Sequence, residues 1–319
     1  MSKRTRLGVG ERPRKPPALV GTTVLDKYVV EAALGSGAMG TVYRARHTRL
    51  ARHVALKVMH DHLVPEPALL QRFYREAKAA ARLQHPNVVP VLDVGETPDG
   101  KHVMVMELVE GTSLGELMET SLPPARILAI IRELLLGLEH AHAAGLVHRD
   151  LKPDNVLVDR SGVARIVDFG IATFARTDEP LDRLTGTGMI IGTPLYMAPE
   201  QARGEPVDHR ADLYALGIIL YEMLSGTSPF EGTAMEVAVA KMDKDPPPMS
   251  ERAPGIAVDR VLDAYLAKLI ARLPAERFPS ARAALDVLDL YGRDRDAAGL
   301  ALGAIDVERA LGVVSLPDL

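Results

Sequence analysis

Short apolar runs dominate the first third of the chain, and longer amphipathic stretches dominate the rest. The short runs predict strands at five places: Tyr28–Val30, Thr41–Ala45, Val54–Met59, Val88–Leu92 and His102–Met106. Apolar residues at spacings of three and four predict helices over 68–83, 125–143, 209–224, 258–272 and 280–290. The loops are marked by proline, glycine and aspartate, as at Ser228–Phe230 and Asp245–Pro248.

Composition narrows the class of protein without identifying it. The 319 residues suffice for one large core or for two lobes that share a cleft. The hydrophobic share of 47% and the charged share of 25% are ordinary for a soluble globular protein. A net charge of −4 argues against a general nucleic-acid binder. Without cysteine the chain has no disulfide, thiolate metal site or cysteine nucleophile, which fits a reducing cytoplasmic compartment.

Neither a membrane span nor a signal peptide is expected in this sequence. The most apolar helix candidate, Leu213–Leu224, is interrupted by Glu222 and is shorter than the roughly 20 residues that cross a bilayer. Residues 1–25 begin with a basic, proline-containing segment without an apolar core, and we expect a disordered tail. Contact of this tail with acidic lipid or with a partner is the functional alternative.

The densest cluster of reactive side chains is the string His-Arg-Asp-Leu-Lys-Pro-Asp-Asn at 148–155, followed by Asp-Phe-Gly at 168–170. Phosphoryl transfer requires an oriented nucleophile, a held metal and compensation of phosphate charge. Asp150 can accept the proton of a substrate hydroxyl, and Lys152 can cover the transferred phosphate. Asn155 and Asp168 offer oxygens to Mg²⁺. Each residue alone could instead be a turn or cap residue.

A glycine-rich segment near the N-terminus has the spacing G-x-G-x-x-G-x-V, formed by Gly35, Gly37, Gly40 and Val42. Glycines let a backbone approach phosphates closely, but this spacing also occurs in dinucleotide-binding turns. The residues that follow favour a second strand over a helix, which indicates a hairpin and argues against a dinucleotide site. Lys57 lies in the next apolar strand, where an unpaired lysine is costly. A snorkelling edge lysine is the alternative.

Taken in order, and with A-P-E at 198–200, these strings resemble the eukaryotic-type (Hanks-type) serine/threonine protein kinases of bacteria. The resemblance covers about residues 26–290. It implies an α+β, two-lobed protein kinase fold, with a small β-rich N-lobe at 26–107, a hinge at 107–111 and a larger, mostly helical C-lobe at 112–290. ATP is expected in the cleft. Residues 291–319 form a C-terminal extension to which we assign no function.

The resemblance assigns roles to individual residues. The catalytic set becomes Asp150, Lys152, Asn155, Lys57 and Glu76, in which Glu76 pairs with Lys57. A surface pair within its own helix is the alternative for Glu76. The nucleotide is expected to bind the glycine-rich segment, the apolar residues around the base, the hinge and the metal-binding aspartate: Leu34, Gly35, Ser36, Gly37, Ala38, Gly40, Val42, Ala55, Lys57, Met106, Glu107, Val109, Leu157 and Asp168.

Three further roles follow from the resemblance. Arg277 pairs with Glu200, although a surface arginine is the alternative, and Asp212 anchors the backbone of the catalytic loop besides capping its helix. The stretch 171–191 reads as an activation loop, in which Thr185 and Thr187 are the expected phosphorylation sites. A phosphothreonine there could pair with the guanidinium of Arg149 and thereby order the loop. Either threonine could also be a solvated loop residue.

The predicted activity is transfer of the γ-phosphoryl group of Mg-ATP, with Mn²⁺ as a substitute ion, to Ser or Thr hydroxyls of proteins. The expected partners are protein substrates and a second copy of the chain, which would allow autophosphorylation in trans. The location is cytoplasmic, or the cytoplasmic part of a longer membrane-anchored kinase. A pseudokinase that binds without turnover and a small-molecule phosphotransferase remain as alternatives. The complete set Lys57, Glu76, Asp150, Asn155 and Asp168 argues against the first, and the A-P-E segment against the second.

Overall fold

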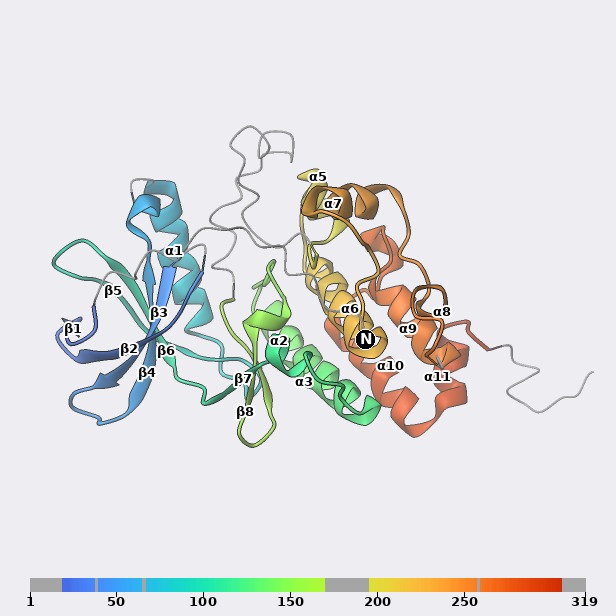
Figure 1. Ribbon diagram of the computed structural model, residues 1–319, viewed down its shortest axis with the longest axis horizontal. Coiled ribbons are helices and arrows are strands. Elements are labelled where there is room, and N and C mark those ends of the chain that lie inside the picture. The colour runs from blue at the N-terminus through green and yellow to red at the C-terminus, as the bar shows by residue number, and fades with distance from the viewer. Residues whose placement is uncertain (1–18, 38–39, 65–66, 170–194, 257–258, 306–319) are drawn as a thin grey trace, which may run out of the picture. The chain divides into compact units, whose positions relative to one another are not determined.

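The computed structural model describes residues 19–37, 40–64, 67–169, 195–256 and 259–305 of the chain (Figure 1). The chain divides into two compact units. The first comprises residues 1–66 and 93–108, and the second comprises residues 67–92 and 109–319. Each unit has its own hydrophobic core.

The first unit is built on a six-stranded sheet with the strand order β1-β2-β3-β4-β6-β5. Strands β1 to β4 and β6 pair with antiparallel neighbours along the sheet. Its elements in chain order are β1 (Thr23–Val24), β2 (Tyr28–Ser36), β3 (Gly40–His47), β4 (His53–Met59), the 3-10 turn η1 (Asp61–Leu63), β5 (Val91–Glu96) and β6 (His102–Glu107).

Alternation of apolar residues explains where the core of this sheet lies. Tyr43 and Ala45 on β3 are almost fully buried, two residues apart, as are Val54 and Leu56 on β4. Side chains two positions apart lie on the same face of a strand. Strand β6 lies between β4 and β5, and its side chains are buried on both faces over Val103–Val105.

The second unit is mostly helical and carries a small three-stranded antiparallel sheet. Its helices are α1 (Pro67–Ala80), α2 (Leu114–Leu117), α3 (Pro124–Ala143), α5 (Pro199–Arg203), α6 (Arg210–Ser225), α7 (Ala234–Asp243), α8 (Met249–Arg252), α9 (Arg260–Leu269), α10 (Ala281–Arg293) and α11 (Arg295–Ala301). Its strands and 3-10 turns are β7 (Gly111–Ser113), η2 (Pro153–Asn155), β8 (Val156–Asp159), β9 (Ala164–Ile166) and η5 (Pro274–Glu276).

Helix α3 is the centre of this unit, because it contacts α6, α10 and β9. Its apolar residues recur at the spacing that the sequence analysis used, and those on the inner face, from Ile127 to Leu138, are almost fully buried. Helix α6 packs on α3 and on α9, and its buried stretch runs from Ala211 to Tyr221. This packing fixes the loops at the ends of α3 and α6, where the candidate site lies.

Two local predictions are wrong. The strand expected at Val88–Leu92 lies further on, at β5, because Val88 and Val89 instead bridge to β9 and Pro90 has no N–H for a ladder. Asp212 does not cap α6, since His209 is the N-cap residue and Asp212 lies in the first turn. The other expected strands and helices are confirmed, although the strand expected at Tyr28–Val30 continues to Ser36 as β2.

Beyond residue 290 the structure describes the chain as far as Ile305. Helix α10 continues to Arg293, and α11 packs against α9 and α10. The Arg295 Nε atom lies 2.6 Å from Asp259 Oδ2 at the start of α9. Gly299 lies so close to α9 that an added Cβ would be 3.1 Å from Val261 Cγ2. This segment therefore belongs to the core of the second unit.

Candidate active site

The loop between α3 and η2 is held by one buried carboxylate. Asp212, which is 1% exposed, accepts backbone N–H bonds from His148 at 2.8 Å and from Arg149 at 2.7 Å. The anchoring role expected of Asp212 is thus confirmed. Burial pushes the pKa of Asp212 up, but the hydrogen bond and charge of His142 and the contacts of His148 outweigh it and hold the pKa below its ordinary value. The carboxylate stays charged as an acceptor for the loop amides.

His148 fastens the same loop from the other side. Its side chain is fully buried, its Nε2 atom lies 2.8 Å from the carbonyl oxygen of Val167, and its ring packs edge-on against Phe169 at 4.9 Å. The next residue, Arg149, adopts φ = 64°, a left-handed conformation that is strained for a residue with a Cβ. Such strain persists only where neighbours determine the conformation, and it is frequent at functional sites.

Asp150 lies at the centre of a short polar network. The Lys152 Nζ atom donates to Asp150 Oδ2 at 2.8 Å. The Asn155 Nδ2 atom donates to the backbone oxygen of Asp150 at 2.8 Å and to Oδ2 at 3.3 Å. The turn η2 begins with Pro153, whose fixed φ suits the first position, and it brings Asn155 back onto Asp150. The geometry therefore aims a carboxylate, an ammonium and an amide at one place.

Asp168 follows β9 and is placed by the same loop. The backbone N–H of Val167 donates to the backbone oxygen of Asn155 at 3.0 Å, which joins the two segments one residue before Asp168. Asp168 itself has φ = 64°. Asn155 uses its amide nitrogen toward Asp150, so its acceptor oxygen is the end suited to a cation. Carboxylate and amide oxygens are the ligands that Mg²⁺ prefers, and these donors fit such an ion.

The glycine-rich segment lies in the first unit, where it joins β2 to β3. The N–H of Gly37 donates to the oxygen of Gly40 at 2.9 Å, and Ser36 Oγ lies 3.0 Å from Thr41 Oγ1. This closes a hairpin, as the residues after the glycines indicate. A Cβ on Gly40 would lie 2.2 Å from the backbone oxygen of Val58, so this position excludes other residues for structural reasons. Ala38 lies outside the described residues.

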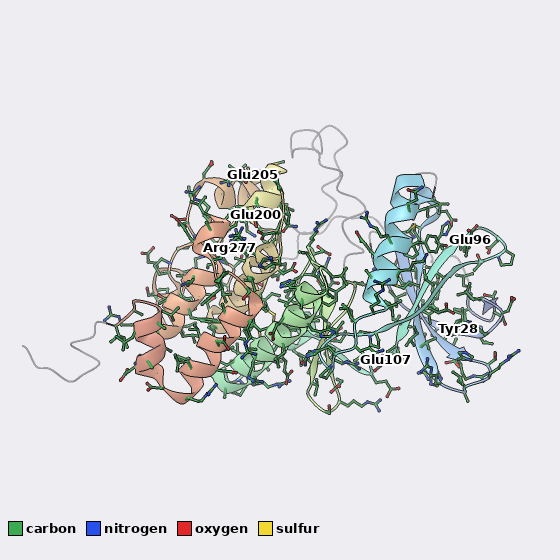
Figure 2. The ribbon with its side chains drawn as sticks, turned by 180° about the vertical axis from the view of Figure 1, so that it is seen from behind. Tyr28, Glu96, Glu107, Glu200, Glu205 and Arg277 are labelled. Carbon is green, nitrogen blue, oxygen red and sulfur yellow. The ribbon has the colours of Figure 1, made fainter. Side chains whose placement is uncertain are left out.

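The remaining nucleotide candidates of the first unit lie on neighbouring strands. Lys57 on β4 is partly buried and lies opposite Val42 of β3 and Met104 of β6. Ala55 pairs with Met106, and both are buried. Glu107 ends β6 (Figure 2). Leu34 is 52% exposed near the end of β2. The sheet register thus brings Val42 next to Lys57 and Ala55 next to Met106.

Glu76, Val109 and Leu157 belong to the second unit. Glu76 lies on α1 and is 9% exposed, so its carboxylate is mostly removed from water. Leu157 lies on β8 opposite Ser113 and Arg165, and Val109 is half-buried ahead of β7. The pairing of Glu76 with Lys57 stays a prediction. Thr185 and Thr187 lie outside the described residues.

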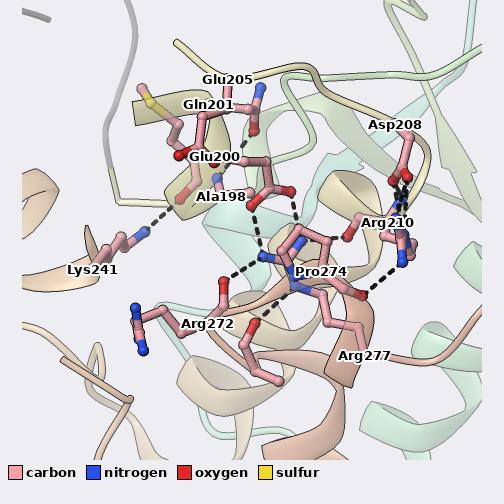
Figure 3. Close-up of polar contacts among 12 residues, drawn as sticks. Ala198, Glu200, Gln201, Glu205, Asp208, Arg210, Lys241, Arg272, Pro274 and Arg277 are labelled. Carbon is pink, nitrogen blue, oxygen red and sulfur yellow. Dashed lines mark hydrogen bonds and ion pairs between the residues drawn. The ribbon is translucent and has the colours of Figure 1, made fainter. Parts of the chain in front are cut away.

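The segment after the expected activation loop is fixed by a buried ion pair (Figure 3). Arg277 donates to the two carboxylate oxygens of Glu200 at 2.7 Å each, and neither residue is more than 2% exposed. A bidentate pair of this kind is geometrically specific, and breaking one partner of a buried pair is strongly destabilising. The prediction that Arg277 pairs with Glu200 is confirmed, and the surface alternative is wrong.

Two residues that the sequence analysis did not single out also contact this region. Gln201 accepts from the N–H of Ala198 at 3.0 Å and donates to the backbone oxygen of Arg149 at 2.8 Å, so it joins α5 to the catalytic loop. Lys241 on α7 is 1% exposed and donates to backbone oxygens before α5. The only sequence signal for Lys241 is its place in the apolar face of α7, four residues after Val237.

Within the described residues there is no group of three or more His, Cys, Asp or Glu side chains that could hold a metal ion by itself. Mg²⁺ characteristically takes one or two protein carboxylates and completes its shell with water and phosphate oxygens, so Asn155 and Asp168 remain a suitable pair. Among the described helices, none is both long enough and apolar enough to cross a membrane.

A strand-rich unit with a glycine hairpin and a helical unit with an anchored Asp–Lys–Asn loop together define a protein kinase fold. Comparison with known families agrees, because residues 28–285 match the protein kinase domain family. The chain belongs to this family. Membership implies the use of ATP and a divalent metal ion.

Two similar proteins come from bacteria. The chain is 40% identical over 289 residues to the serine/threonine-protein kinase pkn3 of Myxococcus xanthus, covering 88% of this chain and 53% of the relative. It is 40% identical over 262 residues to the serine/threonine-protein kinase PknB of Mycobacterium leprae, covering 80% of this chain and 41% of that protein. The chain thus spans about half the length of these relatives, or less.

A solved structure has the same fold. The kinase domain of PknI from M. tuberculosis superposes with a TM-score of 0.69 at 32% sequence identity, covering 86% of this chain and 100% of that one. The expected protein kinase fold is therefore confirmed.

Proposed function

We propose that this chain is a serine/threonine protein kinase, which transfers the γ-phosphoryl group of ATP to Ser or Thr hydroxyls of proteins. The observation that carries the proposal is the Asp150 network, in which a carboxylate is held by Lys152 at 2.8 Å and by Asn155 on a loop anchored by Asp212. Relatives named as serine/threonine-protein kinases support the same activity.

In the proposed reaction the substrate oxygen attacks the γ-phosphorus while its proton passes to a carboxylate oxygen of Asp150. The bond between the γ-phosphorus and the bridging oxygen breaks, and ADP leaves with the bonding electron pair. Lys152 lies beside Asp150 Oδ2 and offsets negative charge on the phosphoryl group during transfer. Asn155 orients Asp150 through the two bonds from its amide nitrogen.

The nucleotide site that we propose uses residues of both units. The glycine-rich segment and Lys57 take the phosphates, with Glu76 as the partner of Lys57. Val42, Ala55, Met106 and Leu157 enclose the base. Glu107 offers a carbonyl and Val109 an N–H to the adenine edge. The complete set adds Leu34, Gly35, Ser36, Gly37, Ala38 and Gly40.

The metal that we propose is Mg²⁺, held by Asn155 and Asp168, with Mn²⁺ as a substitute. When bound, the ion supplies positive charge to the phosphate oxygens. The donor atoms support it, since both residues present hard oxygen ligands on segments joined by the Val167–Asn155 backbone bond.

Regulation is proposed to act through the segment that precedes α5. Thr185 and Thr187 are the proposed autophosphorylation sites, and transfer between two copies of the chain is the proposed route. Its substrates are proteins with Ser or Thr, and it acts in the cytoplasm, either alone or as the cytoplasmic part of a longer membrane-anchored kinase. Nucleic acid is not among the proposed ligands.

The test compares the wild-type chain with Asp150→Asn after incubation with Mg-ATP. We expect phosphate on the wild type alone, detected by intact mass and located by peptide mapping at Thr185 or Thr187. Binding of ATP, measured by calorimetry, should be retained in Asp150→Asn. Equal phosphorylation of both proteins would contradict the role of Asp150. ATP binding without phosphate in either protein, with no peptide substrate phosphorylated, would favour the pseudokinase alternative.

A further inference from the structure

Lys241 is a buried lysine that donates to main-chain oxygens. It lies on α7 with 1% of its surface exposed. Its Nζ atom donates to the carbonyl oxygen of Leu195, and to that of Met197 at 3.1 Å. These acceptors are two residues apart in the segment that leads into α5, and Lys241 reaches toward that segment from α7 (Figure 3). One ammonium therefore fixes the path of the main chain over three residues.

Two further hydrogen bonds hold this segment and the helix that follows it, α5. The Tyr196 hydroxyl donates to Glu222 Oε2 on α6 at 2.6 Å, so the side chain between the two anchored carbonyls is held as well. The Arg203 guanidinium on α5 donates to the backbone oxygen of Met242, next to Lys241. Helix α7 therefore contacts both the segment and the helix that follows it.

The Lys241 ammonium also belongs to a column of buried side chains, formed by Lys241, Tyr214 and Arg277. Its Nζ atom lies 5.4 Å from the ring centroid of Tyr214, and the Arg277 guanidinium carbon lies 4.8 Å from the same centroid. Arg277 in turn holds Glu200 in α5. Cations within about 6 Å of an aromatic ring are attracted to its face. The column thus links the segment before α5 with the ion pair inside it.

Burying a charged lysine side chain at this position costs free energy. Burial lowers the pKa of Lys241 to about 7, against the opposing charge of Glu222. Apolar residues of similar volume often replace buried charged groups without loss of stability, so packing alone gives no reason for a lysine here. Methionine cannot donate to a carbonyl, whereas an ammonium offers three N–H donors. What the lysine adds is the fixed main chain of Leu195–Met197.

The position of that segment indicates what its shape is used for. Gln201 joins the segment and the catalytic loop, because it accepts from Ala198 N–H and donates to the oxygen of Arg149, the residue before Asp150. A polypeptide whose hydroxyl reaches Asp150 passes close to Arg149. The side chain of Gln201 alone separates Arg149 from the segment that contains Ala198. The segment 195–198 is therefore placed to contact the residues that flank the acceptor hydroxyl.

We propose that Lys241 is a positioning residue for the protein substrate, which holds the Leu195–Met197 main chain in the shape that receives the peptide. The proposal rests on the protein kinase activity proposed above and deepens it by naming the residue that shapes the peptide contact. Lys241 touches neither the nucleotide nor the reacting atoms in this role, so its loss should change peptide binding more than ATP binding.

The kinetic test compares Lys241→Met with wild type and with Lys244→Met, which removes an exposed lysine at the end of the same helix. The substrate is the threonine peptide that the wild type phosphorylates fastest within a positional-scanning library. For Lys241→Met we expect the KM for this peptide to rise about tenfold, the loss expected of about one hydrogen-bonded contact, while the KM for ATP stays within about twofold. Lys244→Met should match wild type in both constants.

A second measurement does not depend on turnover. Amide hydrogen exchange at residues 195–198 should be faster in Lys241→Met than in wild type, with exchange in α3 unchanged. If the methionine variant does not fold, Lys241→Gln, which keeps one N–H₂ donor, should give an intermediate change in both measurements.

The outcomes separate the inference from the function on which it rests. Absence of peptide phosphorylation by the wild type would contradict the proposed function, and hydrogen exchange would then decide the role of Lys241 alone. An unchanged peptide KM in an active Lys241→Met, or unchanged exchange at 195–198, would overturn the inference. Equal changes in both KM values, with a lower Tm, would assign Lys241 a structural role only and overturn it as well.

Discussion

The charges of buried ionisable groups in the second unit are compensated in two different ways. Asp212 and Glu200 are each met by cationic or N–H donors at hydrogen-bond distance, which compensates the charge locally. Lys241 donates to backbone carbonyl oxygens and lies over an aromatic ring, and the charge of Glu222 only partly offsets the effect of burial. This difference explains why burial leaves the pKa of Lys241 near 7 while that of Asp212 stays below its ordinary value.

The lowered pKa of Lys241 predicts a specific dependence of stability on pH. Between pH 7 and its ordinary pKa of 10.5 the unfolded chain binds a proton at this lysine that the folded chain does not, so stability rises with pH in this window. The charged groups near it are Glu222 on α6, Arg203 on α5 and Arg277, which shares the Tyr214 ring with it. The Tyr214 phenol is neutral in this window, because burial raises its pKa. Lys241→Met removes the proton-binding group.

The measurement is the free energy of unfolding in urea for the two proteins at pH 7 and pH 9. From pH 7 to pH 9 the stability of wild type relative to Lys241→Met should increase by about 2 kcal/mol, because the cost of a charged buried lysine declines. Titrations elsewhere are common to both proteins and cancel in the difference. Parallel pH profiles would show that Lys241 keeps an ordinary pKa in the folded state.

At the scale of elements, the glycines of the β2–β3 hairpin fall into two groups, one with a structural role and one with a proposed functional role. A Cβ at Gly40 would collide with the backbone of Val58, whereas a Cβ at Gly35 or Gly37 meets no atom within 4 Å in the part of the chain that the structure describes. The spacing pattern alone treats these glycines alike. The structure distinguishes them because β3 and β4 approach closely at Gly40.

Alanine substitutions should therefore have opposite signatures. Gly40→Ala should lower the free energy of unfolding by about 2 kcal/mol, as overpacking against a backbone atom does. Gly37→Ala should change stability by less than about 0.5 kcal/mol, like other substitutions into open space. If the segment cradles phosphates, Gly37→Ala should weaken ATP binding by about tenfold in calorimetry. Stability loss in both variants with equal ATP affinity would contradict this division.

Helix α11 is expected to stabilise the second unit, although it lies after the last residue of the predicted kinase domain. Ala298 is fully buried and Arg295 bonds to Asp259, which caps α9. A chain that ends at Arg293 should have a Tm about 4–8 °C lower, since loss of about 2 kcal/mol of packing shifts Tm by this amount in a domain of this size. A chain that ends at Ile305 is the matched control and should keep the Tm of the full chain.

Thermal unfolding followed by circular dichroism gives both Tm values. Kinase activity of the shorter chain at low temperature should be unchanged, because α11 packs on α9 and α10, which carry none of the proposed catalytic residues. Equal Tm values for all three chains would show that the α11 packing contributes nothing to stability.

At the scale of the whole molecule, the sequence predicted the fold, the anchoring role of Asp212 and the Glu200–Arg277 pair well. An ordered string such as the one around Asp150 rarely arises by chance, and the Glu200–Arg277 pair follows from the same family pattern. The errors are local. Val88–Leu92 has the composition of a strand whichever segment it pairs with, and composition does not reveal that Val89 bonds to β9.

Lys241 illustrates what a sequence cannot reveal. A lysine four residues after an apolar helix position is ordinarily read as solvent-facing, because its long stem can lie along the surface with the charge in water. Only the three-dimensional path of Leu195–Met197 shows acceptors around its Nζ atom. These contacts are distant in sequence and have no pattern of their own.

The proposed nucleotide residues come from both compact units, so ligand binding should stabilise both. With Mg²⁺ and ADP at about 100 times the Kd, each unit should gain about 2.7 kcal/mol against unfolding. Hydrogen exchange measured at β4 in the first unit and at α3 in the second should slow together.

Chelation with EDTA should remove the part of the gain in stability that is due to the metal. In Asp168→Asn the gain should not depend on Mg²⁺, whereas Asp154→Asn, an exposed carboxylate of the same loop, should behave as wild type. Protection confined to one unit would contradict a nucleotide site built from both, and a Mg²⁺-dependent gain in Asp168→Asn would remove Asp168 from the metal site.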